Sequence, residues 1–502
     1  MNQNRPQMTP AAKPVNAPPD RIGQPKSGHE KTLTNIRRLI WLYLALLIIE
    51  GSLRKWVVPQ YSNPLLIIRD PVVILIYLLA LRARVFPWNG FVISLAVIGI
   101  LSVGLSIFVL YDYIPITTIL AVTLYGFRSN FLHLPLIFVM ANVLAEEDIK
   151  KMGWWILLGM IPMSLIMAAQ FQASPESFIN RAAGLGEGQQ IQAGGGKIRP
   201  AGTFSFISGP IFYVSAATAF LIYGALSRRT YKTWLLMASG VALVIAVAVS
   251  GSRSCVASVL LVILSIVVIL VVRPDAVNQF GRSLLIVVVA GLIITRLPIF
   301  KEGIGILSDR FTSSAEAGDT TIVRGMVGRM MEGFTEGFKV LDKLPIAGYG
   351  LGIGTAGGAR FLIGRSAFLL TENEWGRVLL ESGPILGLAF LLWRTVLTFR
   401  ITYLAFRQLI RGRTLPILLF SAGFFALLNG TFGQPTSLGF AVFLSGMCLA
   451  AIQNPKINAE SPSSSKGPTV RGPKPIPHRS EYASRLHAPP AERDQDNGSA
   501  DR

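Results

Sequence analysis

A glycine-rich segment followed by a cluster of carboxylates is the part of the sequence best suited to chemistry. Residues 345–388 are PIAGYGLGIGTAGGARFLIGRSAFLLTENEWGRVLLESGPILGL. Glycines permit positive φ and close approach of the backbone to a ligand or another segment, so we interpret the segment as a shaped loop. Glu372 and Glu374 come shortly before the apolar run 378–399 and are expected at a membrane surface. A carboxylate placed there is a candidate general base.

Arginines between apolar segments form a second group of candidates. Arg253 lies in SGSRS, a short polar interruption between two long apolar runs. A charge at the membrane edge is costly unless it is matched, and a guanidinium can hold two phosphate oxygens of a diphosphate leaving group. Arg199 follows three consecutive glycines in another loop. Arg128 is a further candidate for binding phosphate, but it lies close to His133 in the sequence and is alternatively a structural neighbour of that residue.

Composition places these residues in a membrane protein. The 502 residues are 51 % hydrophobic and 15 % charged, with a mean hydropathy of +0.51, which suits repeated membrane spans. Cys255 and Cys448 lie in apolar runs and indicate neither a disulfide framework nor a metal site. The formal charge of +20 does not indicate nucleic acid, because the positive residues cluster between hydrophobic runs. We therefore expect no metal, no cofactor and no nucleic acid partner.

Apolar segments predict about twelve transmembrane helices of the length a bilayer requires. They lie near 38–53, 64–81, 90–110, 131–145, 153–172, 207–226, 233–250, 254–272, 283–297, 377–398, 415–432 and 436–453. Lys and Arg recur in alternate connections, and such residues are retained on the cytoplasmic side. This pattern predicts that both termini are cytoplasmic. The other face then holds the loops 54–70, 111–130 and 173–206 and the long segment 298–376.

The predicted fold class is an all-α polytopic membrane protein. We divide the chain into a tail of residues 1–36, a membrane domain of residues 37–453 and a second tail of residues 454–502. Both tails lack apolar periodicity and are expected to be disordered and cytoplasmic. Within the large outer loop 298–376, apolar residues of 322–341 recur at three- and four-residue spacing. That spacing predicts an amphipathic helix lying along the membrane interface.

The order of these features resembles the O-antigen ligase and Wzy-type polysaccharide polymerase family. The features are a run of spans, SGSRS entering a helix, one large outer loop with an arginine and GYGLGIG, and then a polar pair and ExGxxxG opening the next helix. The resemblance covers most of 38–453 and implies a GT-C-like fold in the bacterial inner membrane. It implies a metal-independent transfer of a sugar chain from an undecaprenyl diphosphate carrier to an acceptor hydroxyl on the periplasmic face. It also implies that Arg253 and Arg324 lie in the diphosphate site.

One departure from the family concerns the base. Ligases usually carry His-Asn where this chain has Glu372-Asn373, so either a carboxylate replaces the imidazole or Glu372 only orients the acceptor. Glu381, a turn or two into the next helix, is the rival base. The stretches EGSLRKWVVP, LLIIRDP and TENEWGRVLLESG look closer to the exopolysaccharide-polymerase branch. This favours a polymerase over a ligase.

The resulting hypothesis is an inner-membrane glycosyltransferase of exopolysaccharide, O-antigen or capsule biosynthesis. Its partners are an undecaprenyl-diphosphate-linked oligosaccharide and membrane lipid, and a chain-length regulator is left open. The catalytic candidates are Glu372, Glu374 and Arg253, and the candidates for binding diphosphate are Arg253, Arg324, Arg199 and Arg128. Two other classes stay open: a transporter or flippase of lipid-linked saccharides, and a non-catalytic assembly component. Transporters usually show two related halves with broken helices, whereas the long outer loop occurs once.

Overall fold

The protein is mostly helical in the part that the structure describes. The computed structural model describes residues 28–183, 191–227, 230–272 and 344–453, together with residues 305, 335, 337 and 339. The strands within them are β1 (Gln192–Gly194) and β2 (Lys197–Ile198), which pair as an antiparallel hairpin. Helices satisfy their own backbone hydrogen bonds, which a bilayer cannot do for them. The predicted all-α class is confirmed at this level.

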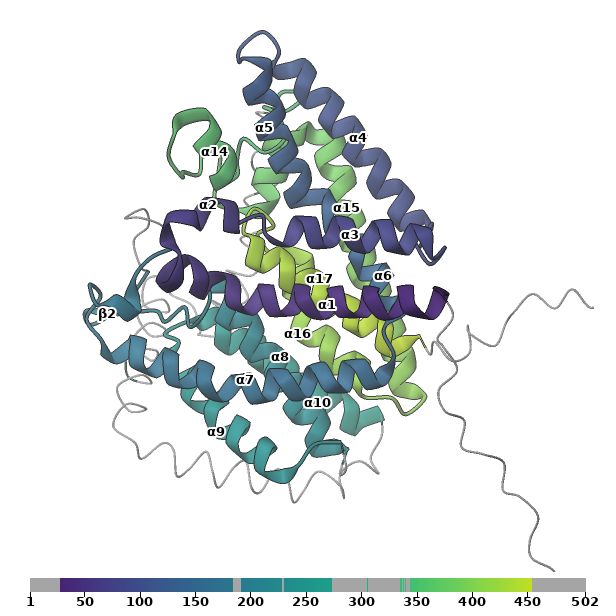
Figure 1. The fold of residues 1–502 in the computed structure, drawn as a ribbon, viewed down its shortest axis with the longest axis vertical. Coiled ribbons are helices and arrows are strands. Elements are labelled where there is room, and N and C mark those ends of the chain that lie inside the picture. The colour runs from purple at the N-terminus through teal and green to yellow at the C-terminus, as the bar shows by residue number, and fades with distance from the viewer. Residues whose placement is uncertain are drawn as a thin grey trace, which may run out of the picture. The chain divides into compact units, whose positions relative to one another are not determined.

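The helices follow the chain order of Figure 1. They are α1 (Gly28–Ser52), α2 (Ser62–Leu65), α3 (Arg69–Arg82), α4 (Gly90–Leu110), α5 (Ile116–Phe127), α6 (Leu136–Val143), α7 (Glu146–Gln172), α8 (Ser208–Leu226), α9 (Thr233–Val249), α10 (Arg253–Val272), α14 (Ala356–Ile363), α15 (Glu374–Ile410), α16 (Leu415–Asn429) and α17 (Pro435–Ile452). Two π-helical segments, η1 (Leu53–Val57) and η3 (Arg128–Leu132), and two 3-10 segments, η2 (Pro59–Tyr61) and η4 (Phe178–Asn180), connect some of them. Nearly every residue of α8 and α17 is buried, so these helices form the centre of the bundle.

Seven helical segments of the described part are long and apolar enough to cross a membrane. They are Pro59–Arg82, Gly90–Leu110, Glu146–Gln172, Ser208–Leu226, Arg253–Val272, Glu374–Ile410 and Pro435–Ile452. The shorter helices α9 and α16 are also apolar. The expected span 283–297 and nearly all of the expected amphipathic helix at 322–341 lie outside the described residues. The structure therefore supports a membrane protein and leaves the number of spans a prediction.

The helical chain starts earlier than the sequence suggested. We expected residues 1–36 to form a disordered tail, but α1 begins at Gly28, so this prediction is wrong for residues 28–36. Thr32 and Thr34 donate hydrogen bonds to carbonyls one turn back, and Ile36 is fully buried. Arg37 then donates to the Val143 carbonyl at 2.9 Å. Burial of Ile36 and the contact of Arg37 with the end of α6 thus hold α1 about two turns after its polar, exposed start.

The expected loop 111–130 is largely helical. Residues 116–127 form α5, which packs against α4 and continues into η3 (Figure 1). The threonines of ITTILAVTLYGF weaken the apolar signal, but Thr123 pairs with Ser106 of α4 at 3.1 Å between hydroxyl oxygens. The buried threonine of this helix is thus satisfied by a neighbouring helix.

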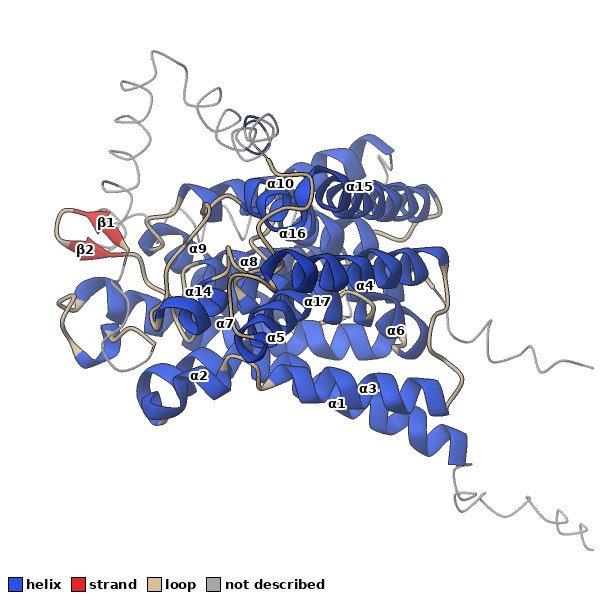
Figure 2. Cartoon of the chain, turned by 90° about the horizontal axis from the view of Figure 1, so that it is seen from above, coloured by secondary structure: helices blue, strands red, loops and turns tan. Residues whose placement is uncertain are grey.

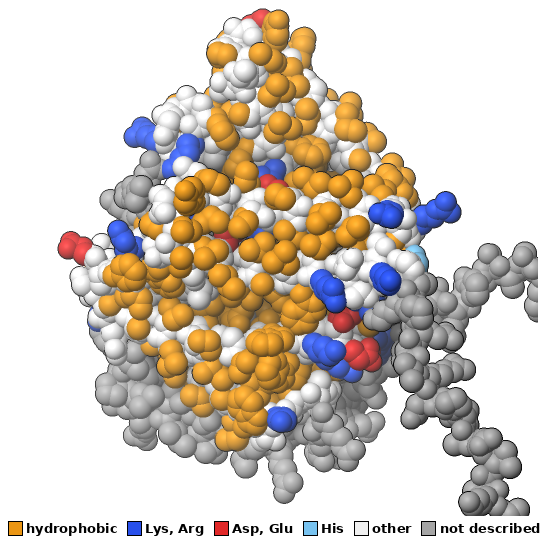
Figure 3. Space-filling model, viewed as in Figure 1, with side chains coloured by type: hydrophobic (Ala, Val, Ile, Leu, Met, Phe, Trp, Pro, Cys, Tyr) orange, Lys and Arg blue, Asp and Glu red, His pale blue; other side chains and the backbone are white. Residues whose placement is uncertain are grey.

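The basic connections that were predicted to share one side of the membrane lie together. Arg37 bonds to the end of α6, and Arg413 contacts both Glu146 at 2.9 Å and the Ile452 carbonyl at 3.3 Å. Tyr231 donates to the Lys150 carbonyl at 3.0 Å. Figure 3 shows Lys and Arg side chains gathered at the right of a mostly hydrophobic face. Figure 2 shows the β1–β2 hairpin at the opposite end of the bundle from the start of α1. We call these the basic end and the hairpin end.

Candidate functional site

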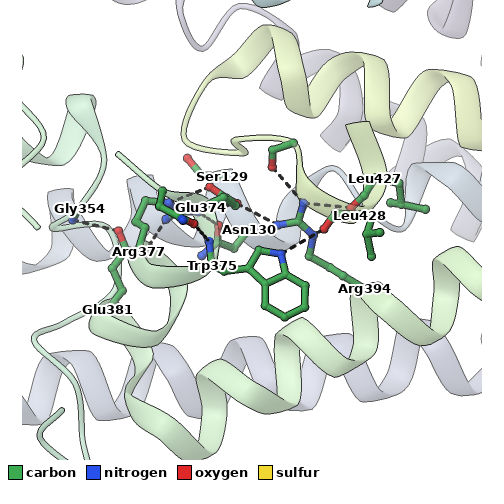
Figure 4. A network of polar contacts seen from close by, with 12 residues as sticks. Ser129, Asn130, Gly354, Glu374, Trp375, Arg377, Glu381, Arg394, Leu427 and Leu428 are labelled. Carbon is green, nitrogen blue, oxygen red and sulfur yellow. Dashed lines mark hydrogen bonds and ion pairs between the residues drawn. The ribbon is translucent and has the colours of Figure 1, made fainter. Parts of the chain in front are cut away.

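A buried ion network lies at the beginning of α15, with Arg377 at its centre (Figure 4). Arg377 donates to the Glu374 carboxylate at 3.1 and 3.0 Å and to Glu381 at 2.7 Å. It also donates to the Asn130 side-chain oxygen in η3 at 2.9 Å. All four residues are buried. One guanidinium therefore joins α15 to the segment between α5 and α6.

A second arginine from the far half of α15 completes the network. Arg394 donates to Glu374 at 3.0 Å and to the Leu427 carbonyl at 3.1 and 3.0 Å. It also donates to the Gly430 carbonyl at 3.0 Å, and its guanidinium lies 3.7 Å from the centre of the Phe432 ring. The last carbonyls of a helix lack partners within the helix. Arg394 donates hydrogen bonds to such carbonyls at the end of α16, and it also neutralises the Glu374 carboxylate.

The glycine-rich loop is attached to this network. The Glu381 carboxylate accepts a hydrogen bond from the Gly354 amide at 2.9 Å, and the Glu381 carbonyl accepts one from Gly350 at 3.0 Å. The expected positive φ is confirmed at Gly348, Gly350 and Gly352, with φ of 69°, 114° and 93°. Gly354, Gly357 and Gly358, which follow in the same segment, do not have positive φ, and Gly357 and Gly358 lie in α14. The loop is therefore shaped by contacts with α15.

The α15 helix is broken where it meets this loop. Gly383 has φ 72° and ψ 174°, a conformation that only glycine adopts without strain, and Pro384 follows it. A β-carbon on Gly383 would lie 2.9 Å from the Gly348 amide nitrogen. The break lets the loop approach the helix backbone closely.

A second set of buried charges is centred on Asp70. Its carboxylate accepts from Arg128 at 2.5 Å and contacts His133 at 2.9 Å. His133 contacts the Tyr43 hydroxyl through its other ring nitrogen at 3.2 Å. Arg128 and His133 thus share Asp70, as expected if they are structural neighbours.

Glu50 at the end of α1 lies between two further arginines. Arg54 and Arg69 each approach its carboxylate at 3.3 Å. Arg54 also donates to the Ser205 hydroxyl at 2.9 Å, and Lys55 donates to the Gly202 carbonyl at 2.6 Å. Residues of η1 therefore hold the segment that follows Arg199.

The structure brings Arg199 to the SGSRS segment. A β-carbon built on Gly251, two residues before Arg253, would lie 3.8 Å from Cγ of Arg199. Arg199 follows β2 directly, and Arg253 is the first residue of α10. Both arginines are partly buried. Arg324, their expected partner, lies outside the described residues.

The two glutamates of the TENE motif occupy different environments. Glu372 is exposed, as expected for a residue at a surface. Asn373 is the N-cap of α15 and accepts from the Trp375 amide at 2.9 Å. Glu374 is only 3 % exposed, because two arginines, Arg377 and Arg394, bind and neutralise its carboxylate. Glu381, the rival base, is 1 % exposed and bound by Arg377.

Two central residues, Glu50 and Arg394, were not singled out from the sequence. Both are ionisable residues within or at the end of an apolar run, which is a functional or structural signal in a membrane helix. The described residues contain no group of three or more His, Cys, Asp or Glu side chains that could hold a metal ion.

No protein-family model, curated protein or solved structure matches the chain.

Proposed function

We propose that this protein is a bacterial inner-membrane glycosyltransferase that transfers an oligosaccharide from an undecaprenyl diphosphate carrier to an acceptor hydroxyl. In this proposal the reaction takes place at the hairpin end of the bundle, on the periplasmic face. A polymerase is favoured over a ligase by the sequence motifs that resemble the exopolysaccharide branch. The basic end and both termini are then cytoplasmic.

The observation that carries the proposal is the contact between Arg199 and the SGSRS segment. The sequence predicts that both Arg199 and Arg253 bind diphosphate, although they are far apart in the chain. The packing of Arg199 against Gly251 brings its side chain to the segment that carries Arg253, and both arginines are partly buried. A departing diphosphate develops negative charge in the transition state, and fixed guanidinium groups stabilise that charge.

The acceptor side of the reaction is assigned to Glu372. Glu374 and Glu381 are both bound to Arg377, so their oxygens already accept charged hydrogen bonds. Glu372 is exposed beside them. A carboxylate that accepts the acceptor proton contributes roughly two to four decades of rate when it is well placed.

The test uses purified full-length protein in lipid nanodiscs with an undecaprenyl-diphosphate-linked oligosaccharide. Release of undecaprenyl diphosphate with growth of the saccharide is the expected result. Arg253→Lys should lose most activity, because an ammonium cannot reproduce the bidentate hold on phosphate oxygens. The exposed Arg365→Lys is the matched control and should keep full activity. Wild-type protein that releases no carrier would refute the proposal.

The base is tested with the same assay. Glu372→Gln keeps the shape and removes the basicity, so transfer should fall by about a hundredfold with little change in carrier affinity. Glu176→Gln, which alters another exposed carboxylate, is the control. Normal transfer by Glu372→Gln would exclude Glu372 as the base.

One observation favours the alternative of a transporter or flippase. The break in α15 at Gly383 and the π-helical segment η3 belong to one polar network, because Arg377 contacts Asn130. Discontinuous helices that meet at polar groups are typical of transporter substrate sites. Movement of a fluorescent lipid-linked saccharide across proteoliposomes without carrier release would favour this class.

A further inference from the structure

Beyond Arg199 and Arg253, a second group of cations lies around Tyr125. It contains Arg54 of η1 and Arg128 of η3, with Arg360 of α14 beside them. The Arg128 guanidinium lies 5.2 Å from the centre of the Tyr125 ring. Arg54 lies near both Tyr125 and Arg360. Arg54 and Arg128 therefore reach one partly buried tyrosine from two separate elements, and Arg360 adds a third cation near Arg54.

The acidic residues in contact do not balance these cations. Glu50 is shared by Arg54 and Arg69, and Asp70 binds Arg128. Arg54, Arg69 and Arg128 thus face only two carboxylates among the described residues, and each of these arginines is at most 9 % exposed. A buried excess charge is costly unless an anion compensates it. Burial and the nearby Arg360 lower the pKa of Arg54, although the Glu50 charge opposes this effect.

Arg128 retains hydrogen-bonding capacity. Its Nε donates to Asp70 and its Nη2 to the Leu66 carbonyl, at 2.5 and 2.6 Å. Its Nη1 is buried and has no hydrogen-bond acceptor among the residues that the structure describes. An unsatisfied charged donor costs more than a neutral one. An anionic oxygen placed near Tyr125 would satisfy it.

The arginines are also held in place before any ligand arrives. Arg54 donates to the carbonyl and hydroxyl oxygens of Ser62 at 2.9 and 3.1 Å and to the Ser205 hydroxyl. Arg360 is partly buried and donates to the exposed Asn63 side chain. The cluster therefore combines hydrogen-bonded, buried arginines with an exposed edge at Asn63, which Arg360 contacts. Preorganised guanidinium groups of this kind suit phosphate oxygens.

We propose that Arg54, Arg128 and Tyr125, with Arg360 at the exposed edge of the cluster, form a binding site for the phosphate group of a phosphate ester. Glu50 and Asp70 are already paired with arginines and leave one positive charge uncompensated, so the ligand is expected to be an anion. The proposal rests on the proposed function only in the choice of diphosphate as the probe. The elements that build the site, η1, η3 and α14, differ from those that carry Arg199 and Arg253.

The experiment measures binding of inorganic diphosphate to full-length Arg253→Lys protein in phosphatidylcholine nanodiscs. This background weakens the site at Arg253 and leaves the Tyr125 cluster unchanged. Adding Arg128→Lys or Arg54→Lys should weaken binding by about tenfold or more, since each keeps the charge and loses the fork. Tyr125→Phe should weaken binding less. The exposed Arg365→Gln is the control and should bind as the background does.

Thermal unfolding of each variant separates binding from folding. Tyr125→Phe and Arg360→Gln leave the buried ion pairs intact, so they should unfold at the background temperature and still weaken binding. Unchanged affinity in all four variants of the cluster would overturn the proposal. If phosphatidylglycerol in the nanodisc displaces diphosphate, the site takes a lipid headgroup; if it does not, the site takes a more polar phosphate ester. The two proposals can fail separately. If Arg128→Lys weakens diphosphate binding but wild-type protein releases no carrier in the transfer assay, this site is supported and the proposed function is refuted.

Discussion

Arg377 is a buried cation that binds two carboxylates and an amide. Glu374, Arg377, Glu381 and Arg394 together carry no net charge, and each is at most 3 % exposed. Burying these groups is costly, and the cost is offset only while every partner is present. At the scale of single residues, the network therefore determines which carboxylates are available for chemistry. Glu372 is available, whereas Glu374 and Glu381 are bound.

Removing Arg394 should destabilise the fold strongly. Arg394→Met leaves Glu374 with one arginine and removes the partner of the Leu427 and Gly430 carbonyls. The free energy of unfolding should fall by about 3–5 kcal/mol, the usual cost of breaking a buried ion pair. Denaturant unfolding in detergent measures it. Arg400→Met, at an exposed position of the same helix, is the control and should change stability by less than about 0.5 kcal/mol. Equal losses in both variants would contradict the structural role of the network.

Lys55 should make stability depend on pH. Burial lowers the pKa of its amine from 10.5 to about 7. Between these values the unfolded chain holds a proton that the folded chain lacks, so the free energy of unfolding should rise with pH over this range. Relative to Lys55→Met, wild-type protein should therefore gain thermal stability between about pH 7 and about pH 10. Exposed Lys232→Met is the control, and its difference from wild type should not change with pH. A constant difference for Lys55→Met would contradict the lowered pKa.

At the scale of elements, α15 acts as two helices joined at Gly383. The first half carries Glu374, Arg377 and Glu381, and the second half carries Arg394. The break exposes backbone groups that the glycine-rich loop satisfies, since Leu380 and Glu381 carbonyls accept from Tyr349 and Gly350. The loop and the first half of α15 therefore form one structural unit.

Gly383→Ala should disrupt that unit. The positive φ is strained for alanine by roughly 1–3 kcal/mol, and the added β-carbon would meet the backbone of Gly348. We expect lower thermal stability and faster proteolysis of the loop around Gly350. Gly104→Ala in α4 is the matched control, because nothing lies within 4 Å of its added β-carbon. It should be neutral or stabilising by up to about 1 kcal/mol. A Gly383→Ala protein as stable as wild type would exclude a role for the positive φ.

For the whole molecule, the two ends of the bundle differ in charge and in architecture. Arg37, Lys150 and Arg413 lie at the basic end with their carbonyl and carboxylate partners. Arg199 follows β2 at the hairpin end, and Arg54 donates to Ser205 in the segment that follows Arg199. The positive-inside rule predicts that the basic end is cytoplasmic.

Cysteine labelling tests this orientation. Glu176→Cys should react with a membrane-impermeant maleimide in right-side-out vesicles, and Arg411→Cys should react only in inside-out vesicles. Both positions are exposed, and the native Cys255 and Cys448 are buried and should stay unlabelled. The reverse pattern would invert the topology and remove the periplasmic site from the proposed function.

The sequence by itself determined the long apolar helices and their shared basic end. The expected span 90–110 coincides with α4, the expected span 254–272 differs from α10 by one residue at its start, and the expected span 436–453 differs from α17 by one residue at each end. Continuous apolar runs predict such helices because burial of the backbone requires internal hydrogen bonding. The α5 helix was missed, since its threonines weaken the apolar pattern and Thr123 is satisfied only by contact with Ser106 of α4.

Only the tertiary structure decided how the charged residues are paired. Sequence spacing placed Glu372 and Glu374 together, yet one is exposed and the other is bound by Arg377 and Arg394. Spacing also gave no reason for Arg199 to lie against Gly251. An ion pair between distant segments depends on which helices pack together, and local composition carries no information about that choice. Charges inside an apolar bundle show that partners exist, and the packing of the helices determines which ones they are.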